Sequence, residues 1–590
     1  MRKYLSLILV LMLVFSLGMS AYASGEASGS SSGEASASAG STPVEAVIDV
    51  SDGGVHEEEN VLIERDELYL RGVNVSAGTL TLGGEKGRYD VAFDENGVPH
   101  ASEGDTWNSV IILDDPDHAS DKLYGDGARE NSLGSGIYTA GEDSFIEVDN
   151  AFIWTSGAVR SAMAINSLST AVVKNSFIES TGAITCYKPV TRLLLSTCRA
   201  NVFVGGTAYY YNSEIVSGDW GALSTDTGGP NSTYLYAYNV DTDNTVGGYS
   251  TYADTNCFVE IYGSRLRSAE YGGFIACSGK LRIGGADEAS EAALAYADAD
   301  DLLASGEPSE IVAGRNDIVI HLVDSMGNNS GYNSITGTLD ISDTTLKTDR
   351  NILTERDYYN DPNAEAYGEC GYFLDYCSGS AIALRSTNAD ITLTNVTFYP
   401  YENNVTGRPI AIHSFLNYDA RGAVSVPDGE ASLGQNVAIA DSVVDGDILH
   451  ADYQRPMEVS LTASTLNGAV VSGTCAGWNA LWTDVEDNGL AENFNAAKIY
   501  ELLTKNESYE TVWGVRLTLD GNSVWNVTGD SSLYSLTLAE GAQLILPEGA
   551  AVYVNVDMSN GDLSYDASTG TRVETLEPGV AYTGVVITLG

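Results

Sequence analysis

A short phrase recurs through the middle of this chain. It consists of alternating apolar residues, then Asn or Asp, then a small or branched residue and a further apolar one. Asn and Asp tolerate the left-handed backbone conformation that a sharp one-residue bend between two strands requires. The phrase therefore predicts strands joined at such bends. The bend residues of its copies are Asn150, Asn175, Asn212, Asn239, Asp324, Asp343, Asn395 and Asp441.

The spacing of these residues constrains the fold more than any single copy does. Asn150 and Asn175 lie 25 residues apart, Asn212 and Asn239 lie 27 apart, and another pair lies 19 apart. Gaps of 37 and 52 residues fit two coils, or one coil with an insertion. A period of roughly 20–27 residues with two-residue alternation inside each unit indicates stacked coils, since one coil cannot bury its own apolar face.

We therefore predict an all-β fold, a right-handed parallel β-helix (solenoid) with short helical insertions. The alternative is a β-sandwich with Asn in its hairpin turns. Asn-Gly pairs between strands, which are typical of tight hairpins, are scarce here. The pattern favours the solenoid.

The first residues indicate export. Residues 1–23 have the pattern of a secretory signal peptide, with Arg2 and Lys3 before an apolar run and a small-x-small site at residues 21–23. Residues 24–43 are almost all Ser, Gly, Ala and Glu, which is typical of a flexible linker. The remaining sequence has no apolar stretch long enough to span a bilayer. We expect a secreted, extracellular protein, released or associated with the cell surface, without membrane insertion.

The rest of the chain divides at breaks in the strand pattern. We expect the β-helix, with an N-terminal cap, at 44–478, a helical insertion at 479–513, and C-terminal coils with a cap at 514–590. A second break at 286–306 is rich in Ala, Glu, Asp and Leu and predicts a helical or loop insertion. Neither break has a metal or nucleotide motif, so both are interpreted as decorations of the coil.

The charge excludes some partners. The chain has 29 Lys and Arg against 81 Asp and Glu, a formal net charge of −52. Nucleic acids and anionic membranes are bound through a basic surface, so neither is an expected partner. The acidity can serve solubility or create scattered cation sites. Because the Asp-x-Asp-x-Asp-Gly loop of calcium sites is absent, we expect no cofactor and leave Ca²⁺ as an open alternative.

The last segment carries the most specific phrase in the chain. Ser523, Trp525, Val527, Thr528 and Gly529 form a Ser-x-Trp-x-Val-Thr-Gly sequence before a Leu-rich strand. It resembles the terminal coils of bacterial β-helix adhesins and autotransporter passengers. From about residue 61 to 590 the chain is similar in style to secreted bacterial β-helix proteins with the pectin-lyase-like fold. The resemblance implies the fold and says less about activity, since these families share architecture more than function.

Seven cysteines in an exported chain raise the question of disulfides. Cys257 and Cys277 are 20 residues apart, about one coil, and neighbouring coils stack at about 4.8 Å, within the Cα range of a disulfide. Cys370 and Cys377 bracket a short loop and form a second candidate pair. The alternative, that the cysteines are buried small apolar residues, stays open. No Cys-x-x-Cys spacing indicates zinc.

Enzymatic activity is the main functional alternative. A polysaccharide lyase needs a base beside Ca²⁺-binding acids, and a glycoside hydrolase needs two carboxylates facing one groove. No candidate group lies in a family motif, so we assign no catalytic, cofactor-binding or metal-binding residue and favour a non-catalytic protein. The groups considered are Asp114 with Asp115, Asp300 with Asp301, Arg315 with Asp317 and His321, and His413.

Tyrosines supply the binding hypothesis. The chain has 34 Tyr, and we expect Tyr209, Tyr211, Tyr234 and Tyr236 as ligand-stacking residues. Alternation places Tyr209 and Tyr211 on one side of a strand and Tyr210 on the other. These tyrosines can also pack in the core. We predict a protein of adhesion or of carbohydrate and surface binding, whose partner is an extracellular glycan or surface protein. The alternatives are the enzyme and a structural extracellular stalk. The sequence does not fix the oligomeric state.

Overall fold

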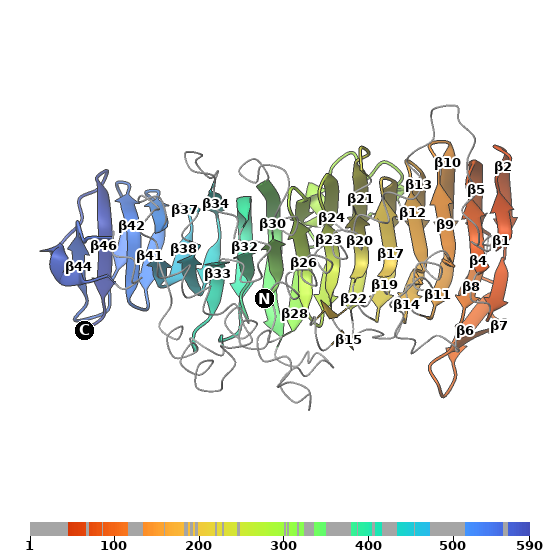
Figure 1. Cartoon of the computed structure of the whole chain (residues 1–590), viewed down its shortest axis with the longest axis horizontal. Helices are drawn as coiled ribbons and strands as arrows, with labels where there is room; N and C mark the ends of the chain where they lie inside the picture. The colour runs from red at the N-terminus through yellow and green to blue at the C-terminus, as the bar shows by residue number, and fades with distance from the viewer. Residues whose placement is uncertain are drawn as a thin grey trace, which may run out of the picture.

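The computed structural model has the parallel β-helix architecture that the repeat predicts. Strands follow one another around a long axis, and each pairs in parallel with the equivalent strand of the next coil. The coils succeed one another in chain order along that axis (Figure 1). The part of the chain that the structure describes contains no α-helix.

The predicted insertion at 479–513 and the pair Cys370–Cys377 lie outside the residues that the structure describes. These residues run from 45 to 590 with the exception of 67–69, 85–86, 116–133, 158–159, 182–186, 189–192, 195–198, 219–220, 227–228, 245–247, 300–301, 304–305, 315–317, 324–335, 350–378, 386, 404–406, 416–433, 453–454, 473–513 and 559–564.

Each full coil contributes a strand to three faces, named first, second and third in the order in which the chain visits them. The strands of the first face are β1 (Glu45–Val50), β4 (Leu70–Val75), β9 (Ile137–Ala140), β12 (Met163–Asn166), β17 (Arg199–Val204), β20 (Gly221–Asp226), β23 (Tyr249–Ala253), β26 (Tyr271–Ala276), β29 (Ile320–Val323), β31 (Ile382–Arg385), β33 (Ile410–Phe415), β36 (Asp447–Ala451), β39 (Val470–Ser472) and the start of β42 (Ser531–Leu538).

The second and third faces share two long strands, β30 (Thr336–Asp349) and β32 (Asn388–Tyr399), which run from one face onto the other. The other strands of the second face are β2 (Val55–Glu59), β5 (Gly78–Gly83), β10 (Ser144–Asp149), β13 (Thr170–Lys174), β18 (Thr207–Tyr211), β21 (Thr233–Tyr238), β24 (Cys257–Tyr262), β27 (Lys280–Gly284), β34 (Gln435–Ala440), β37 (Pro456–Thr462) and β40 (Gly514–Leu519). Those of the third face are β3 (Leu62–Arg65), β8 (Ser109–Leu113), β11 (Ala151–Thr155), β14 (Phe177–Ser180), β19 (Glu214–Ser217), β22 (Asp241–Asn244), β25 (Arg265–Ser268), β28 (Ser309–Gly314), β35 (Val443–Asp445), β38 (Thr465–Gly468), β41 (Val524–Val527) and β43 (Gln543–Ile545).

Side chains that point inward pile on one another from coil to coil and form the core. In one row of the second face Leu235, Val259, Leu281 and Leu339 succeed each other in register, and each is at most 1% exposed. Burying such a side chain contributes roughly 1.5–3 kcal/mol. Stacking therefore supplies the apolar contacts that one coil lacks.

The predicted left-handed bends are confirmed at the corner between the second and third faces. Asp324 lies outside the described residues. The gaps of 37 and 52 residues are single coils with insertions, because β13 pairs directly with β18 and β30 pairs directly with β32. The backbone angle φ lies between 42° and 52° at Asn150, Asn175, Asn212, Asn239, Asp343, Asn395 and Asp441.

A ladder of serine hydroxyls runs inside the same corner. The Ser213 hydroxyl accepts the backbone N–H of Ser176 in the preceding coil at 3.2 Å and donates to the carbonyl of Tyr211 at 2.8 Å. The ladder satisfies buried backbone groups at the bend, where the strand hydrogen bonds are interrupted. Equivalent acceptor hydroxyls belong to Ser109, Ser176, Ser264, Ser309, Ser442, Ser464 and Ser523.

The C-terminal end departs from the parallel pattern. Strand β46 (Ala581–Thr588) runs antiparallel to β42 and to β44 (Ala551–Val554), and β45 (Thr571–Val573) pairs antiparallel with β44. A 3₁₀ turn, η5 (Ala567–Thr569), precedes β45. These strands extend the sheet beyond the last parallel coil and form the blue end in Figure 1.

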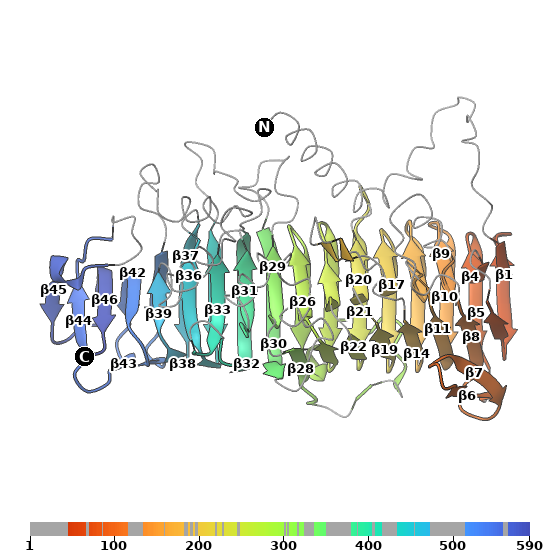
Figure 2. The ribbon, with the colours of Figure 1, turned by 60° about the horizontal axis from the view of Figure 1, so that its bottom comes forward.

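Two further strand pairs branch from the coil. β6 (Tyr89–Phe93) and β7 (Pro99–Glu103) form an antiparallel hairpin, seen next to β8 at the N-terminal end in Figure 2. Two aromatic rings pack on Phe152 of the third face. The ring centroid of Phe93, at the end of β6, lies 6.2 Å from that of Phe152, and the centroid of Trp107, which follows the hairpin, lies 5.8 Å from it. The second pair is β15 (Tyr187–Lys188) with β16 (Leu193–Leu194).

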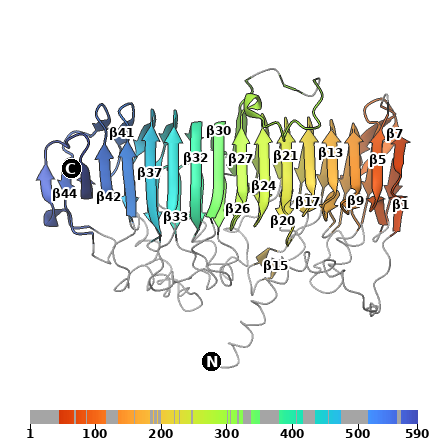
Figure 3. The ribbon, with the colours of Figure 1, turned by 90° about the horizontal axis from the view of Figure 1, so that it is seen from above.

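The predicted insertion at 286–306 is a loop, here named the strap. It begins with one 3₁₀ turn, η1 (Ala286–Glu288), and continues through turns at residues 291–296. The strap leaves the end of β27 and arches over β24 and β21 in Figure 3. Among the described residues, no helix has the length and apolar character needed to cross a bilayer.

Candidate functional site

Tyrosines form outward-facing rows on the second face. Tyr209 and Tyr236 occupy equivalent positions in neighbouring coils, and their rings stack at 5.1 Å. Tyr211 and Tyr238 form the next row, whereas Tyr210 points into the core and is fully buried. The predicted alternation of Tyr209 and Tyr211 against Tyr210 is therefore confirmed.

The strap covers these rows. The Tyr211 hydroxyl donates to the carbonyl of Ala293 at 2.8 Å and accepts the N–H of Tyr296 at 3.3 Å. The Tyr296 ring packs edge-on against Tyr209 at 4.8 Å. Tyr211 is only 1% exposed, so it has no ring face open to a ligand while the strap is in place. The structure thus gives this tyrosine a structural contact where the sequence predicts a stacking surface.

An ion pair fastens the strap. Lys174 Nζ lies 2.8 Å from an Asp298 carboxylate oxygen and 3.9 Å from Glu147. The Lys174 side chain is 9% exposed, and its ammonium lies 6.0 Å from the ring centroid of Tyr211. The hydrogen bond from Lys174 and its charge lower the pKa of Asp298.

Tyr234 lies at the margin of this arrangement. Its ring stacks on Phe258 of the next coil at 5.1 Å, and Lys280 Nζ lies 5.1 Å from the Phe258 ring centroid. Tyr234 is partly exposed. Among the described residues, no contact with the strap is found for Tyr234, and Tyr236 stacks on Tyr209.

The predicted disulfide between Cys257 and Cys277 is absent, and both residues are buried thiols. The reason lies in the register. Phe258 pairs with Lys280, an offset of 22 residues, so the position stacked on Cys257 is that of Gly279. Cys277 falls two residues earlier, at the corner after β26, where its φ is 54°. A spacing close to the period is therefore insufficient to place two cysteines opposite each other.

An open hollow of about 410 Å³ lies at the edge of the third face. Tyr399, at the end of β32, is 56% exposed and pairs in register with Lys347. Pro400 follows Tyr399, and because proline has no N–H the strand hydrogen bonds stop there. The residues that line the hollow are Lys347, Thr348, Asp349, Phe398, Tyr399, Pro400, Tyr401, Pro409 and Asp445.

A polar row leads away from this hollow along the third face. Asn467 Nδ2 donates to Asp445 Oδ1 at 2.6 Å, and Asn526 Nδ2 donates to Asn467 Oδ1 at 2.6 Å. The three residues occupy equivalent positions in successive coils. The amide row fixes the Asp445 carboxylate at the side of the hollow.

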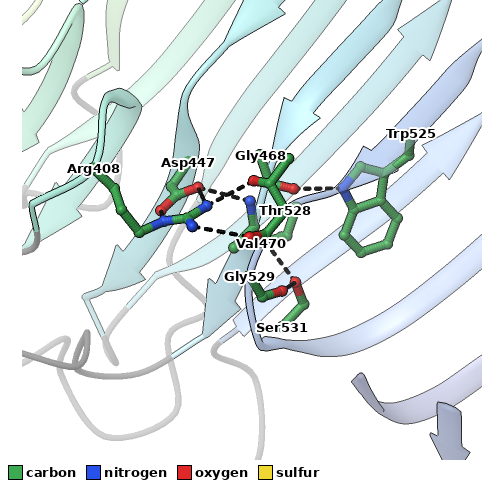
Figure 4. A network of polar contacts seen from close by, with 9 residues as sticks. Arg408, Asp447, Gly468, Val470, Trp525, Thr528, Gly529 and Ser531 are labelled. Atoms are coloured by element: carbon green, nitrogen blue, oxygen red, sulfur yellow. Dashed lines mark hydrogen bonds and ion pairs between the residues drawn. The ribbon is translucent and has the colours of Figure 1, made fainter. Parts of the chain in front are cut away.

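A charged network braces the adjoining corner (Figure 4). Arg408 donates from Nε and Nη2 to the two carboxylate oxygens of Asp447, each at 2.6 Å, and from Nη1 and Nη2 to Thr528. The Asp447 side chain is 6% exposed, and its hydrogen bond and charge raise the pKa of Arg408. The network holds Pro409, the next residue, in the wall of the hollow.

This network also accounts for the Ser-x-Trp-x-Val-Thr-Gly phrase. Ser523 extends the serine ladder, and Trp525 is fully buried with its indole N–H donating to the carbonyl of Gly468 at 2.9 Å. Thr528 accepts from Arg408, and a Cβ on Gly529 would lie 3.1 Å from the Arg408 guanidinium carbon. These four residues of the phrase therefore each have a structural role in the last coils.

A group of carboxylates lies elsewhere on the third face. Glu179 on β14 is the strand partner of Trp154 on β11. In the next two coils, Glu214 on β19 is the strand partner of Asp241 on β22. Burial, and second the charge of Glu214, raise the pKa of Glu179 to about 7. Burial also raises the pKa of Glu214 and of Asp243. Trp154 is 2% exposed, and its indole N–H has no acceptor among the residues that the structure describes.

The remaining candidates of the sequence have structural surroundings or lie outside the described part. Asp114 accepts from the Ser156 hydroxyl at 2.5 Å, and the Asp115 N–H donates to the same hydroxyl at 2.7 Å. His321 packs between Tyr271 and Phe274, and burial lowers its pKa to about 3. The candidates outside the described residues are Asp300, Asp301, Arg315 and Asp317.

His413 is fully buried, and burial lowers its pKa to about 3. Among the described residues, no three His, Cys, Asp or Glu side chains come together in an arrangement that could hold a metal ion.

The sequence analysis did not predict the Tyr399 hollow, although the sequence contains a pattern that indicates it. Tyr399–Pro400–Tyr401 is an aromatic pair around a strand-ending proline.

Comparison with known proteins adds no family. No model of a protein family matches the chain, and no curated protein is significantly similar to it in sequence. The fold defines the class, which is a parallel β-helix.

Proposed function

We propose that this protein is an extracellular, non-catalytic β-helix that binds glycans at the Tyr399 hollow. The observation that carries the proposal is the exposed Tyr399 ring, 56% accessible, in an open hollow beside Asp349, Asp445 and Lys347. An aromatic ring next to polar groups suits a sugar, which presents an apolar face and a rim of hydroxyls.

The shape of the site supports a chain-like ligand. The hollow is open, and Asp445, Asn467 and Asn526 continue from it along the third face in successive coils. Successive coils repeat at about 4.7–4.9 Å, so the face offers regularly spaced polar groups to an extended polymer. The signal peptide that the sequence predicts at residues 1–23 supports a site outside the cell, where an adhesion function requires it.

The test is binding by the purified chain from residue 24 onward on a glycan array, followed by calorimetry on the ligands found. We expect Tyr399→Ala to weaken binding about tenfold, which corresponds to about 1.4 kcal/mol. Tyr399→Phe keeps the ring and should retain most of the affinity. Phe93→Ala, which removes an exposed aromatic side chain on the hairpin, is the matched control. Equal affinities of the wild type and Tyr399→Ala would refute this site.

A hydrolase is the second candidate, favoured by one observation. Glu179 holds its proton up to about pH 7 beside the carboxylate of Glu214, the combination that general acid catalysis of glycoside cleavage uses. Release of reducing ends from plant and host polysaccharides, abolished in Glu179→Gln, would establish this activity over the non-catalytic proposal. If the chain shows neither glycan binding nor turnover, the structural stalk remains as its function.

A further inference from the structure

The charges around the Tyr399 hollow do not balance. Among the described residues that line it are two carboxylates, Asp349 and Asp445, and one cation, Lys347, whose Nζ lies 4.0 Å from Asp349. Glu402 is exposed, and its backbone forms an isolated β-bridge with Pro409, another residue that lines the hollow. Within the described part of this site carboxylates therefore outnumber ammonium groups, which favours a positively charged ligand.

Asp445 retains capacity to accept hydrogen bonds. Its Oδ1 accepts from Asn467, and its Oδ2 has no donor among the residues that the structure describes. The Asn467 oxygen is itself occupied by Asn526, so the amide row holds the carboxylate in place. A carboxylate held in this way can pair with an ammonium group at little ordering cost.

The guanidinium of Arg408, the residue before Pro409 in the wall of the hollow, is already engaged in hydrogen bonds. Recognition of a uronate carboxylate typically uses the fork of an arginine. Arg408 directs that fork at Asp447, with two hydrogen bonds of 2.6 Å, and it also donates to Thr528. An acidic polysaccharide would therefore meet the Asp445 carboxylate with Lys347 as the one cation among the described residues that line the hollow.

We propose that the glycan recognised at the Tyr399 hollow carries protonated amino groups, as in an amino-sugar polymer that is not N-acetylated. This inference rests on the proposed glycan-binding function. The ammonium group pairs with Asp445 while the sugar ring stacks on Tyr399. A cation close to the tyrosine face is also attracted to the ring.

The experiment compares three oligosaccharides of equal length by calorimetry on the chain from residue 24 onward. They are a glucosamine oligomer, its N-acetylated counterpart and a galacturonic acid oligomer, at mildly acidic pH and at low and high salt. We expect the glucosamine oligomer to bind tightest and the galacturonate weakest. The preference should shrink at high salt, because exposed charges are screened.

Two variants change the charge in opposite directions. Asp445→Asn should lower the ratio of glucosamine affinity to N-acetylated oligomer affinity about two- to fivefold, and Lys347→Gln should raise that ratio by a similar factor. Lys347→Gln leaves the amide row intact, so the test survives any local disturbance by Asp445→Asn. Asp441→Asn is the matched control, because it removes an exposed carboxylate at a bend where other coils carry Asn.

The outcomes separate the inference from the proposal beneath it. Equal binding of the amino and N-acetylated oligomers, with no effect of either charge variant, would overturn the inference and leave Tyr399 as a neutral glycan site. Tightest binding of the galacturonate would also overturn it. No binding by any of the three oligomers or on the glycan array would refute the proposed function and, with it, the inference.

Discussion

Replacing Glu179 by Gln should remove a pH dependence of stability from the third face. The pKa of Glu179 is about 7 in the folded chain against an ordinary value of 4.5, mainly because burial disfavours the charged form. Between these values the folded state keeps a proton that the unfolded state has released. The folded state therefore loses stability as the pH rises through this window, by roughly 3 kcal/mol in total.

The assay is urea denaturation of the wild type and Glu179→Gln at about pH 4 and about pH 8. Hydrogen exchange in β11, β14 and β19 supplies the local free energy of opening, since coils of a solenoid can open separately. We expect the wild type to lose up to about 3 kcal/mol more than the variant between these pH values. Glu57→Gln, at an exposed position on β2, is the control. A parallel pH response of the wild type and Glu179→Gln would refute the reasoning.

Three further substitutions test the contacts that hold the coils together. Arg408→Ala should destabilise the C-terminal coils by about 3–5 kcal/mol in urea denaturation, because it leaves the buried Asp447 carboxylate unpaired; an unchanged midpoint would contradict this. Ser213→Ala should cost about 1–3 kcal/mol, measured by the same method, because one buried N–H loses its acceptor. Lys174→Met should accelerate hydrogen exchange in the strap about two- to fivefold by removing the ion pair with Asp298; an unaltered rate would exclude that pair as its fastening.

The bends could be predicted because their cause is local. Asn150 and its equivalents need a left-handed φ, and few residues other than Gly accept one. The alternation around Tyr210 is equally local, so its burial followed from the sequence. What covers the neighbouring Tyr209 and Tyr211 could not be predicted, because Tyr296 and Ala293 belong to a segment more than eighty residues further along the chain.

Spacing alone failed where an offset of two residues decides the outcome. Cys257 and Cys277 are one coil apart by count, yet the local period is 22 residues and their side chains are not opposed. The raised pKa of Glu179 likewise depends on burial by neighbouring coils, which a charge pattern does not encode. The hollow at Tyr399 arises where a proline ends a strand, so its existence could be inferred from the sequence but its polar rim could not.

The Arg408 network has a mechanical consequence. In a simple solenoid each coil touches only its neighbours, so the terminal turn can peel away without disturbing those behind it. Arg408 precedes β33 and donates hydrogen bonds to Thr528, which precedes β42. One side chain therefore links two points of the chain that are 120 residues apart. A tensile load applied at the C-terminus must break these Arg408–Thr528 hydrogen bonds before the coils that they link can separate one at a time.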